Sequence, residues 1–253
     1  MTVDKTPDRV RGMFNEISPR YDLLNRCLSL GIDRYWRRRT TRILQPKSGD
    51  SILDVCCGTG DLSLALWRAS RRQAEVKGVD FAAGMLEIAR KKFEAACRKS
   101  IKGNAKGSGK PSETEAAIEF IEADAMRLPF EANRFDIVSV AFGLRNICDF
   151  QVGLTEMARV CRSGGQVAVL EFSSPRGLIL GPLFNWYFRN ILPRIGQAIA
   201  RNRYRAYEYL PQSVGEFPQG EELAQYMKSA GMTDVFYRPL TFGIATLYVG
   251  RKP

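Results

Sequence analysis

The chain contains no histidine, and its six cysteines include no Cys-x-x-Cys pair. Zinc sites are built mostly from these two residue types at short spacings, so we expect no metal. Several cysteines lie in apolar segments, where free thiols pack as small hydrophobic groups, and this indicates a reducing compartment. Without histidine, the chain also lacks the side chain that most often acts as a base at neutral pH.

Long hydrophobic runs are missing as well. Residues Met1 to Gly12 are polar and charged and lack the apolar region of a signal peptide. The longest aromatic and aliphatic run, around Leu178 to Phe188, contains Gly181, Pro182 and Asn185 and is too short to cross a bilayer. We therefore expect a cytoplasmic protein that is either soluble or peripheral at the inner face of the cell membrane.

Acidic residues are outnumbered, since 38 Lys and Arg against 27 Asp and Glu give a net charge of +11. Such a balance suits nucleic acid, anionic lipid head groups or acidic substrates, and a generally basic soluble surface is the simpler alternative. With 45% apolar and 26% charged residues, the composition is that of a globular protein with a substantial core.

From Ser51 onward, apolar runs of strand length alternate with segments of helical periodicity, which predicts an α/β fold with a mostly parallel sheet. We predict strands at 51–56, 75–79, 118–121, 135–142, 165–172, 235–238 and 244–249, the last two as a hairpin, and helices at 61–70, 85–98, 151–161 and 221–230. Residues 99–111, rich in Lys, Gly and Ser, read as a flexible surface insertion. We divide the single domain into an N-terminal helical segment (1–48), a cofactor-binding core (49–172), a helical cap (173–214) and a C-terminal helix and hairpin (215–253).

The most informative stretch is Asp54-Val55-Cys56-Cys57-Gly58-Thr59-Gly60-Asp61, where an apolar strand enters a Gly-x-Gly turn. Glycines let the backbone approach a ligand closely, and the amides of the following helix face that ligand. Position 63 is serine, so the third glycine of a dinucleotide fingerprint is missing. The carboxylates of Asp54 and Asp61 oppose a pyrophosphate but suit an ammonium and a sulfonium, as in S-adenosylmethionine. A simple tight turn is the alternative.

Two further acidic positions follow predicted strands. Asp80 stands twenty residues after Gly60, where a carboxylate accepts hydrogen bonds from ribose hydroxyls, or else caps the next helix. Asp124 and Ala125 offer a carboxylate and an amide that can read adenine, with a solvated loop as the alternative. Because ligands of such sheets bind at the carboxyl ends of the strands, all three elements are expected at one pocket.

Beyond the turn and the acidic residues, several other segments of the sequence resemble those of a known methyltransferase family. Its segments match, in order and over nearly the whole length, the class I C-methyltransferases that act on demethylmenaquinone and on 2-polyprenyl-6-methoxy-1,4-benzoquinol. The segments that carry the resemblance are Met13-Phe14-Asn15-Glu16-Ile17-Ser18-Pro19-Arg20-Tyr21-Asp22, Asn25, Ser29, Trp36, residues 53–62, Phe142-Gly143-Leu144-Arg145-Asn146, Leu170-Glu171-Phe172-Ser173 and residues 204–213. The Gly-Leu-Arg-Asn segment discriminates best, because all class I methyltransferases share the Gly-x-Gly turn.

The resemblance implies a Rossmann-like fold with a mostly parallel seven-stranded sheet, a final antiparallel strand, N-terminal helices and an inserted helical cap. It implies S-adenosylmethionine as cofactor, with contacts at Thr59, Asp80, Asp124 and Ala125. The implied reaction is methylation of the reduced ring of demethylmenaquinol to menaquinol, with a polyprenyl-benzoquinol of ubiquinone biosynthesis as a further candidate substrate.

Methylation of a ring carbon is easiest when a neighbouring hydroxyl has become a phenolate. We assign Arg145 to stabilising that charge and Asn146 to orienting a ring oxygen, because a guanidinium fork suits an anionic oxygen. Tyr21 and Asp22, on the N-terminal segment, are candidates for proton transfer. The alternatives are a surface ion pair between Arg145 and Asp149, and plain core packing for Tyr21.

Residues 178–209 mix aromatic and aliphatic side chains with arginines, which suits a polyprenyl tail and an anionic membrane surface. Internal packing of the cap, or a homodimer interface, is the alternative. Two other functions stay open. One is a nucleic-acid methyltransferase, prompted by the charge although the chain lacks an Asn/Asp-Pro-Pro-Tyr segment. The other is a non-catalytic cofactor-binding scaffold of a quinone-biosynthesis complex. We expect a polyprenylated quinol as partner and no nucleic acid.

Overall fold

The computed structural model describes residues 4–104, 116–175, 186, 190 and 206–253. The described α-helices are α1 (Pro7–Leu28), α2 (Asp33–Leu44), α3 (Asp61–Ala69), α4 (Ala83–Asn104), α5 (Phe150–Val160), α8 (Ala206–Glu216) and α9 (Glu221–Ser229). The strands are β1 (Ser51–Val55), β2 (Glu75–Asp80), β3 (Ile118–Glu122), β4 (Phe135–Ala141), β5 (Cys161–Phe172), β6 (Thr233–Leu240) and β7 (Ala245–Arg251). Two short 3-10 helices are η1 (Leu144–Asn146) and η3 (Thr241–Gly243).

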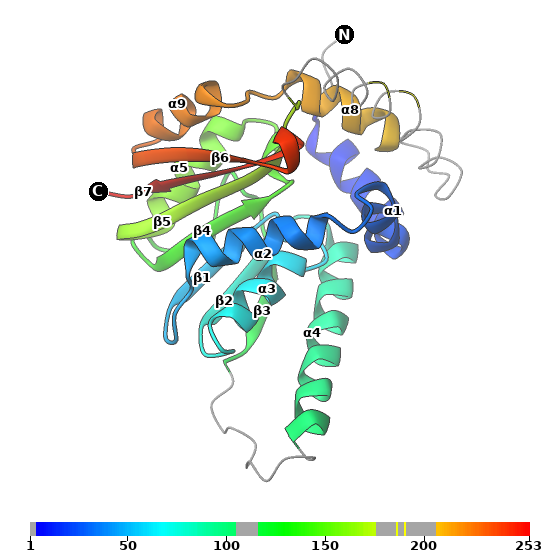
Figure 1. Cartoon of the computed structure of the whole chain (residues 1–253), viewed down its shortest axis with the longest axis vertical. Helices are drawn as coiled ribbons and strands as arrows, with labels where there is room; N and C mark the ends of the chain where they lie inside the picture. The colour runs from blue at the N-terminus through cyan, green and yellow to red at the C-terminus, as the bar shows by residue number, and fades with distance from the viewer. Residues whose placement is uncertain (1–3, 105–115, 176–185, 187–189, 191–205) are drawn as a thin grey trace.

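The seven strands form one sheet in the order β3-β2-β1-β4-β5-β7-β6 (Figure 1). Strands β1 to β5 pair in parallel, whereas β7 runs antiparallel between β5 and β6. The predicted α/β fold, its seven strands and the C-terminal hairpin are confirmed. Strands β1 and β4 are neighbours at the centre of the sheet. From β1 the chain continues to β2 and β3 toward one edge, and from β4 it continues to β5 toward the other, so the direction of the strand order reverses between β1 and β4. Ligands of such sheets bind outside the carboxyl ends of strands at such a reversal.

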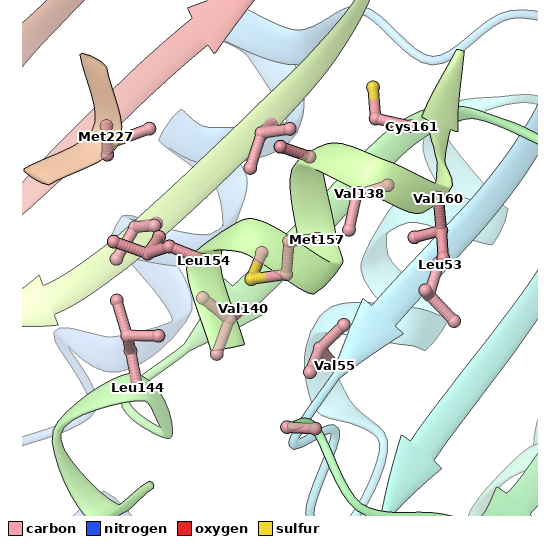
Figure 2. Packing of buried hydrophobic residues seen from close by; sticks show 14 of the residues in the cluster. Leu53, Val55, Val138, Val140, Leu144, Leu154, Met157, Val160, Cys161 and Met227 are labelled. Atoms are coloured by element: carbon pink, nitrogen blue, oxygen red, sulfur yellow. The ribbon is translucent and has the colours of Figure 1, made fainter. Parts of the chain in front are cut away.

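Helices cover both faces of the sheet, as parallel strands require. Alternate residues of a strand point to opposite faces, so Leu53 and Val55 of β1 point into a cluster that also contains Met157 of α5 and Met227 of α9 (Figure 2). Ile52 points the other way, into a cluster formed with α2, α3 and α4. Both clusters consist of buried aliphatic and aromatic side chains, which fix the sheet on which the turn after β1 rests.

Two predicted element boundaries are wrong by more than two residues. Strand β5 begins at Cys161 rather than at Gly165, because Cys161 pairs with Phe135 and the register then shifts before Gln166 resumes the ladder. Helix α4 ends at Asn104, so residues 99–104, read as part of the insertion, are helical. Lysine is a good helix former and serine only a moderately unfavourable one, so a composition rich in these residues did not mark the end of the helix. The rest of the insertion, 105–111, lies outside the described residues.

A third hydrophobic cluster joins α1 to α8 above the carboxyl ends of the strands (Figure 1). It contains Val10, Met13 and Ile17 of α1, with Met85 of α4 and Tyr209 of α8. The predicted cap, 173–214, lies largely outside the described residues, and α8 contains its final part. Within the described ranges, none of the helices has the length and apolar character needed to cross a bilayer.

Candidate active site

The Gly-x-Gly turn has the backbone shape that its glycines permit. Gly58 and Gly60 both have positive φ angles, +55° and +77°. A Cβ on Gly60 would meet Phe120 and Ala89 at 3.0 and 3.1 Å, so this position has room only for glycine. A Cβ on Gly58 would meet nothing within 4 Å, which leaves the surface of the turn open toward the pocket.

Asp80 fixes this turn from the end of β2. Its carboxylate accepts the amide of Gly58 at 2.8 Å and the amide of Ala82 at 2.9 Å. Burial raises the pKa of Asp80, and the amide hydrogen bonds oppose that shift. Each carboxylate oxygen retains a lone pair for a further donor. The Asp80 carboxylate both holds the chain ahead of α4 and lines the pocket. The geometry is therefore compatible with both interpretations from the sequence, a cap of the next helix and an acceptor for ribose hydroxyls.

The pocket lies at the carboxyl ends of β1, β2, β3 and β4, below α1, and contains about 870 Å³ of empty space including its open mouth. Six of the predicted site residues meet in its wall: Tyr21, Gly58, Asp80, Asp124, Ala125 and Asn146. The remaining five, Asp22, Asp54, Thr59, Gly60 and Arg145, are not part of that wall.

Asp54 lies buried beneath the turn rather than beside the pocket. The hydroxyls of Ser63 and Ser139 donate to its carboxylate at 2.6 and 3.0 Å. Burial raises the pKa of Asp54 to about 6, against the effect of both hydroxyls. The carboxylate is thus a poorly solvated charge below the turn at neutral pH.

Asp22 belongs to a charged cluster on the other side of the turn. Its carboxylate accepts the Thr59 hydroxyl at 2.5 Å and pairs with Lys92 of α4 at 2.8 Å. Lys92 also pairs with Asp61, which in turn faces Arg37 of α2 at 3.5 Å. Burial opposes the ionisation of Asp61, but the charges of Arg37 and Lys92 outweigh it and lower the pKa. These contacts connect α1 to the turn and occupy both carboxylates.

Arg145 is buried, and its partner is not the predicted Asp149. Its Nη1 donates to the two oxygens of Glu171 at 2.8 and 3.1 Å and to the Phe142 carbonyl at 2.5 Å. Asp149 instead caps α5 by accepting two backbone amides. The alternative of a surface ion pair between Arg145 and Asp149 is therefore wrong. Glu171 was missed as a site residue, although an acid at the carboxyl end of β5 was a usable signal.

Asn146 connects the pocket to α8. Its Nδ2 donates to the Phe142 carbonyl at 3.3 Å, and the Tyr209 hydroxyl donates to its Oδ1 at 3.2 Å. Gly143 makes this arrangement feasible, since a Cβ there would lie 2.4 Å from that of Cys56. The sequence interpretation also missed other residues of the wall, among them Lys5, Arg11, Phe14, Cys56 and Cys148.

This strand order, with an antiparallel β7 beside β5, and the Gly-x-Gly pocket at the carboxyl ends define the class of S-adenosylmethionine-dependent methyltransferases with a Rossmann-like fold. The residues present fit this cofactor, because the surface of Gly58 is open and Asp80 keeps acceptor capacity toward the pocket. The ubiE/COQ5 methyltransferase family matches residues 1–252, and the chain belongs to that family.

Two relatives illustrate the match. The ubiquinone/menaquinone biosynthesis C-methyltransferase of Geobacter sulfurreducens is 40% identical over 97% of this chain and 89% of its own length. The demethylmenaquinone methyltransferase of Thermus thermophilus is 44% identical over 95% of this chain and 100% of its own length. At such identity over nearly whole chains, these relatives share the fold of this chain.

Solved structures of lower identity share only the fold. A SAM-dependent methyltransferase of Thermotoga maritima has a TM-score of 0.62 at 16% identity and covers 96% of this chain and 100% of its own. The [4+2]-cyclase SpnF has a TM-score of 0.66 at 15% identity, with 100% and 99% covered. A fold that also supports a cyclase does not by itself assign a reaction, so the family match carries the assignment.

Proposed function

We propose that this chain transfers the methyl group of S-adenosylmethionine to a ring carbon of demethylmenaquinol, forming menaquinol. A polyprenyl-benzoquinol of ubiquinone biosynthesis is the second acceptor that the relatives' names suggest. The observation that carries the proposal is the family match over residues 1–252, joined to one pocket whose wall combines Gly58 and Asp80 with the aromatic side chains of Phe14, Tyr21 and Phe142.

Within this proposal, the cofactor end is formed by the turn and the first three strands. Gly58 gives the backbone close access, Asp80 receives the ribose hydroxyls with its free lone pairs, and Asp124 with the amide of Ala125 reads adenine. Asp54, Thr59 and Gly60 act from behind this surface, by charge and by the shape of the turn. The cofactor supplies an electrophilic methyl group when bound.

The acceptor end is formed by α1, η1 and the loop after β4. Phe14 and Phe142 give apolar walls for a ring, and Asn146 orients a ring oxygen from its fixed position. Glu171 occupies Nη1 of Arg145, so Arg145 does not offer a free guanidinium fork to a phenolate oxygen as the sequence interpretation expected. It contributes to the acceptor end through its place beside Asn146. Tyr21 is a hydrogen-bond donor to the substrate, since burial raises the pKa of its phenol.

We further propose a peripheral position on an anionic membrane, where a polyprenylated quinol resides. Leu30 and Tyr35 are 83% and 48% exposed around the start of α2, and the exposed Arg34 and Arg38 lie on the same helix. Apolar side chains beside arginines suit the interface of anionic lipids. The cytoplasmic location and a homodimer remain proposals of the same kind.

The test is incubation of the purified protein with methyl-labelled S-adenosylmethionine and reduced demethylmenaquinone in vesicles. We expect label in the lipid and none in tRNA or rRNA offered in parallel. Label in the nucleic acid would replace the quinol proposal. Tight cofactor binding by calorimetry without transfer to any acceptor would indicate a scaffold instead.

A further inference from the structure

Lys5 reaches the wall of the pocket from the segment ahead of α1. Asp4 fixes this segment, because its carboxylate accepts the Thr6 amide and the Arg9 guanidinium, each at 3.0 Å. Lys5 itself is half-buried, and within the part of the chain that the structure describes its ammonium has neither a hydrogen bond nor an ion pair. A cation that has lost part of its water and has no protein partner is available to an anionic group of a ligand.

The charged and titratable groups around Lys5 place it at the proposed acceptor end. They are Arg145 of η1, Glu171 of β5, Glu216 of α8 and Cys148, which follows η1. Burial lowers the pKa of Lys5, and Arg145 acts in the same direction, whereas the two carboxylates oppose it. Shifts large enough to discharge a lysine at neutral pH belong to fully buried groups, and Lys5 is only partly buried. Lys5 is therefore an ammonium at neutral pH.

Two other cations lie near the pocket, and both are committed elsewhere. The guanidinium carbon of Arg11, also in the wall, lies over the Phe81 ring, 5.8 Å from its centroid. Phe81 directly follows β2, so this contact belongs to the proposed cofactor end. Arg145 is not part of the wall, and Glu171 neutralises its charge. Among the described residues of the wall, Lys5 is thus the cation that the acceptor end offers.

We propose that the Lys5 ammonium is the counter-charge of the ring oxygen when the quinol hydroxyl ionises, an inference that rests on the proposed function. The hydroxyl proton leaves to water at the open mouth of the pocket, and the electron pair stays on the oxygen opposite the ammonium. A cation that is already in the wall stabilises this charge where it develops.

Lys5 forms and breaks no bond in this reaction. The ring carbon forms a bond to the methyl carbon, and the bond from methyl to sulfur breaks with its electron pair left on sulfur. The ring carbon then loses its hydrogen as a proton to water, and the ring oxygen regains a proton from water. The ammonium acts by making the ring electron-rich, since a phenolate donates more electron density to the ring than a neutral hydroxyl does.

The first test measures the ionisation of a bound aryl alcohol without methyl transfer. 1-Naphthol is bound in the presence of S-adenosylhomocysteine, and the absorbance of naphtholate gives the ionisation constant of the bound hydroxyl. Wild type should raise this constant about tenfold over Lys5→Met, because a nearby opposite charge favours the ionised form. Lys5→Arg retains the positive charge and should retain most of this increase. Lys91→Met is the matched control and should equal wild type, because the Lys91 side chain on α4 is 69% exposed and pairs with Glu87.

The second test follows the methylation rate against pH. The wild-type kcat should rise with pH as the bound quinol ionises and then reach a plateau. In Lys5→Met the inflection should move about one pH unit upward, which lowers kcat at neutral pH about tenfold, whereas in Lys5→Arg it should stay near the wild-type position. The affinity for S-adenosylhomocysteine by calorimetry and the melting temperature should stay at wild-type values in both variants.

Equal ionisation constants of bound naphthol in wild type and Lys5→Met would overturn the role of Lys5. The role would also be wrong if Lys5→Arg were as impaired as Lys5→Met, because the positive charge is what the proposal requires. A loss of S-adenosylhomocysteine affinity in Lys5→Met, with the naphthol constant unchanged, would place the ammonium at the cofactor instead. Wild type that methylates no quinol but ionises naphthol through Lys5 would reject the proposed acceptor and keep the site for an aryl oxyanion.

Discussion

The two ends of the pocket are constructed differently. At the proposed cofactor end the groups are backbone amides and carboxylates at strand ends, and Asp80 accepts the amides of Ala82 and of Gly58, which lies 22 residues earlier in the sequence. At the proposed acceptor end they are side chains from distant segments. Arg145 pairs with Glu171, and Asn146 is held by Tyr209, 63 residues further along the chain.

This difference has a physical consequence. Neighbouring strands hold the turn through ladder hydrogen bonds, so the cofactor end depends on the integrity of the sheet. The acceptor end depends on one buried ion pair and on helices packed across the top of the sheet. Substitutions that break the Arg145–Glu171 pair at the acceptor end should therefore lower the stability of the fold. Substitutions at the cofactor end should mainly lower the affinity for the cofactor.

The largest effect is expected for Glu171→Ala. This variant leaves the Arg145 guanidinium buried without its counter-charge, which typically costs about 3–5 kcal/mol of unfolding free energy. Urea unfolding measures the loss. Glu87→Ala is the matched control, because it breaks an exposed pair with Lys91, and it should change stability by less than about 0.5 kcal/mol.

The double variant Glu171→Ala/Arg145→Met sharpens this prediction. It removes both charges, so it should recover part of the stability that Glu171→Ala loses. Equal losses in Glu171→Ala and Glu87→Ala would show that the acceptor end does not depend on its ion pair, and the contrast between the two ends would disappear.

At the cofactor end, Asp80→Ala should weaken cofactor binding about 30-fold, equivalent to about 2 kcal/mol. The amides of Gly58 and Ala82 lose their acceptor, and the turn loses the group that holds its open surface toward the pocket. Calorimetry gives the affinity. Asp124→Ala should have a smaller effect, because that exposed carboxylate accepts only the Met126 amide. A Kd unchanged in Asp80→Ala would exclude Asp80 from the cofactor site.

The contrast between the ends also explains what the sequence revealed. The Gly58–Asp61 turn and Asp80 lie in one strand–turn–helix–strand unit, so local pattern and spacing predicted them together. The ion pair of Arg145 joins residues 26 positions apart, and the alternative Asp149, four residues away, was the nearer candidate in sequence. Lys5 has no motif of its own. It comes to the pocket wall only when α1 folds across the pocket.

The same reasoning applies to the fold. Apolar runs of strand length predicted all seven strands, because strands that are buried on both faces are nearly continuous in apolar residues. The predicted start of β5 was wrong, because the four residues between Cys161 and Gln166 interrupt the pairing and contain no apolar run. The direction of β7 depends on the hairpin with β6, which a local pattern can suggest, whereas its place beside β5 is a long-range pairing.

Asp54→Asn should stabilise the protein at neutral pH by about 2 kcal/mol. The folded pKa, about 6, lies above the ordinary value of 3.8, so the folded state holds a proton that the unfolded state has lost. The contribution of Asp54 to the free energy of unfolding is therefore fully present below about pH 4 and is lost as the pH rises through about 6. Melting temperatures of Asp54→Asn and wild type should differ at pH 7.5 and converge at pH 4.

Asp61→Asn is the control from the other side of the turn, and it should have the opposite sign. The folded pKa of Asp61 is lowered, so its charge contributes stability above the ordinary pKa and loses it as the pH falls. Asp61→Asn should thus be less stable than wild type at pH 7.5. If both variants moved stability in the same direction, the two carboxylates would not differ in environment as the geometry requires.

The smallest effect is expected for Lys92→Met, which removes the cation shared by Asp22 and Asp61. The Lys92 side chain is 25% exposed, so water and salt screen the pair, and the loss should be about 1 kcal/mol and smaller at high salt. Since Asp22 belongs to α1 and Lys92 to α4, hydrogen exchange should accelerate in α1 while the amides of β1 and β4 keep their protection. Faster exchange across the whole sheet would mean that α1 does not unfold independently of the sheet. Both ends of the pocket would then depend on a single cooperative unit.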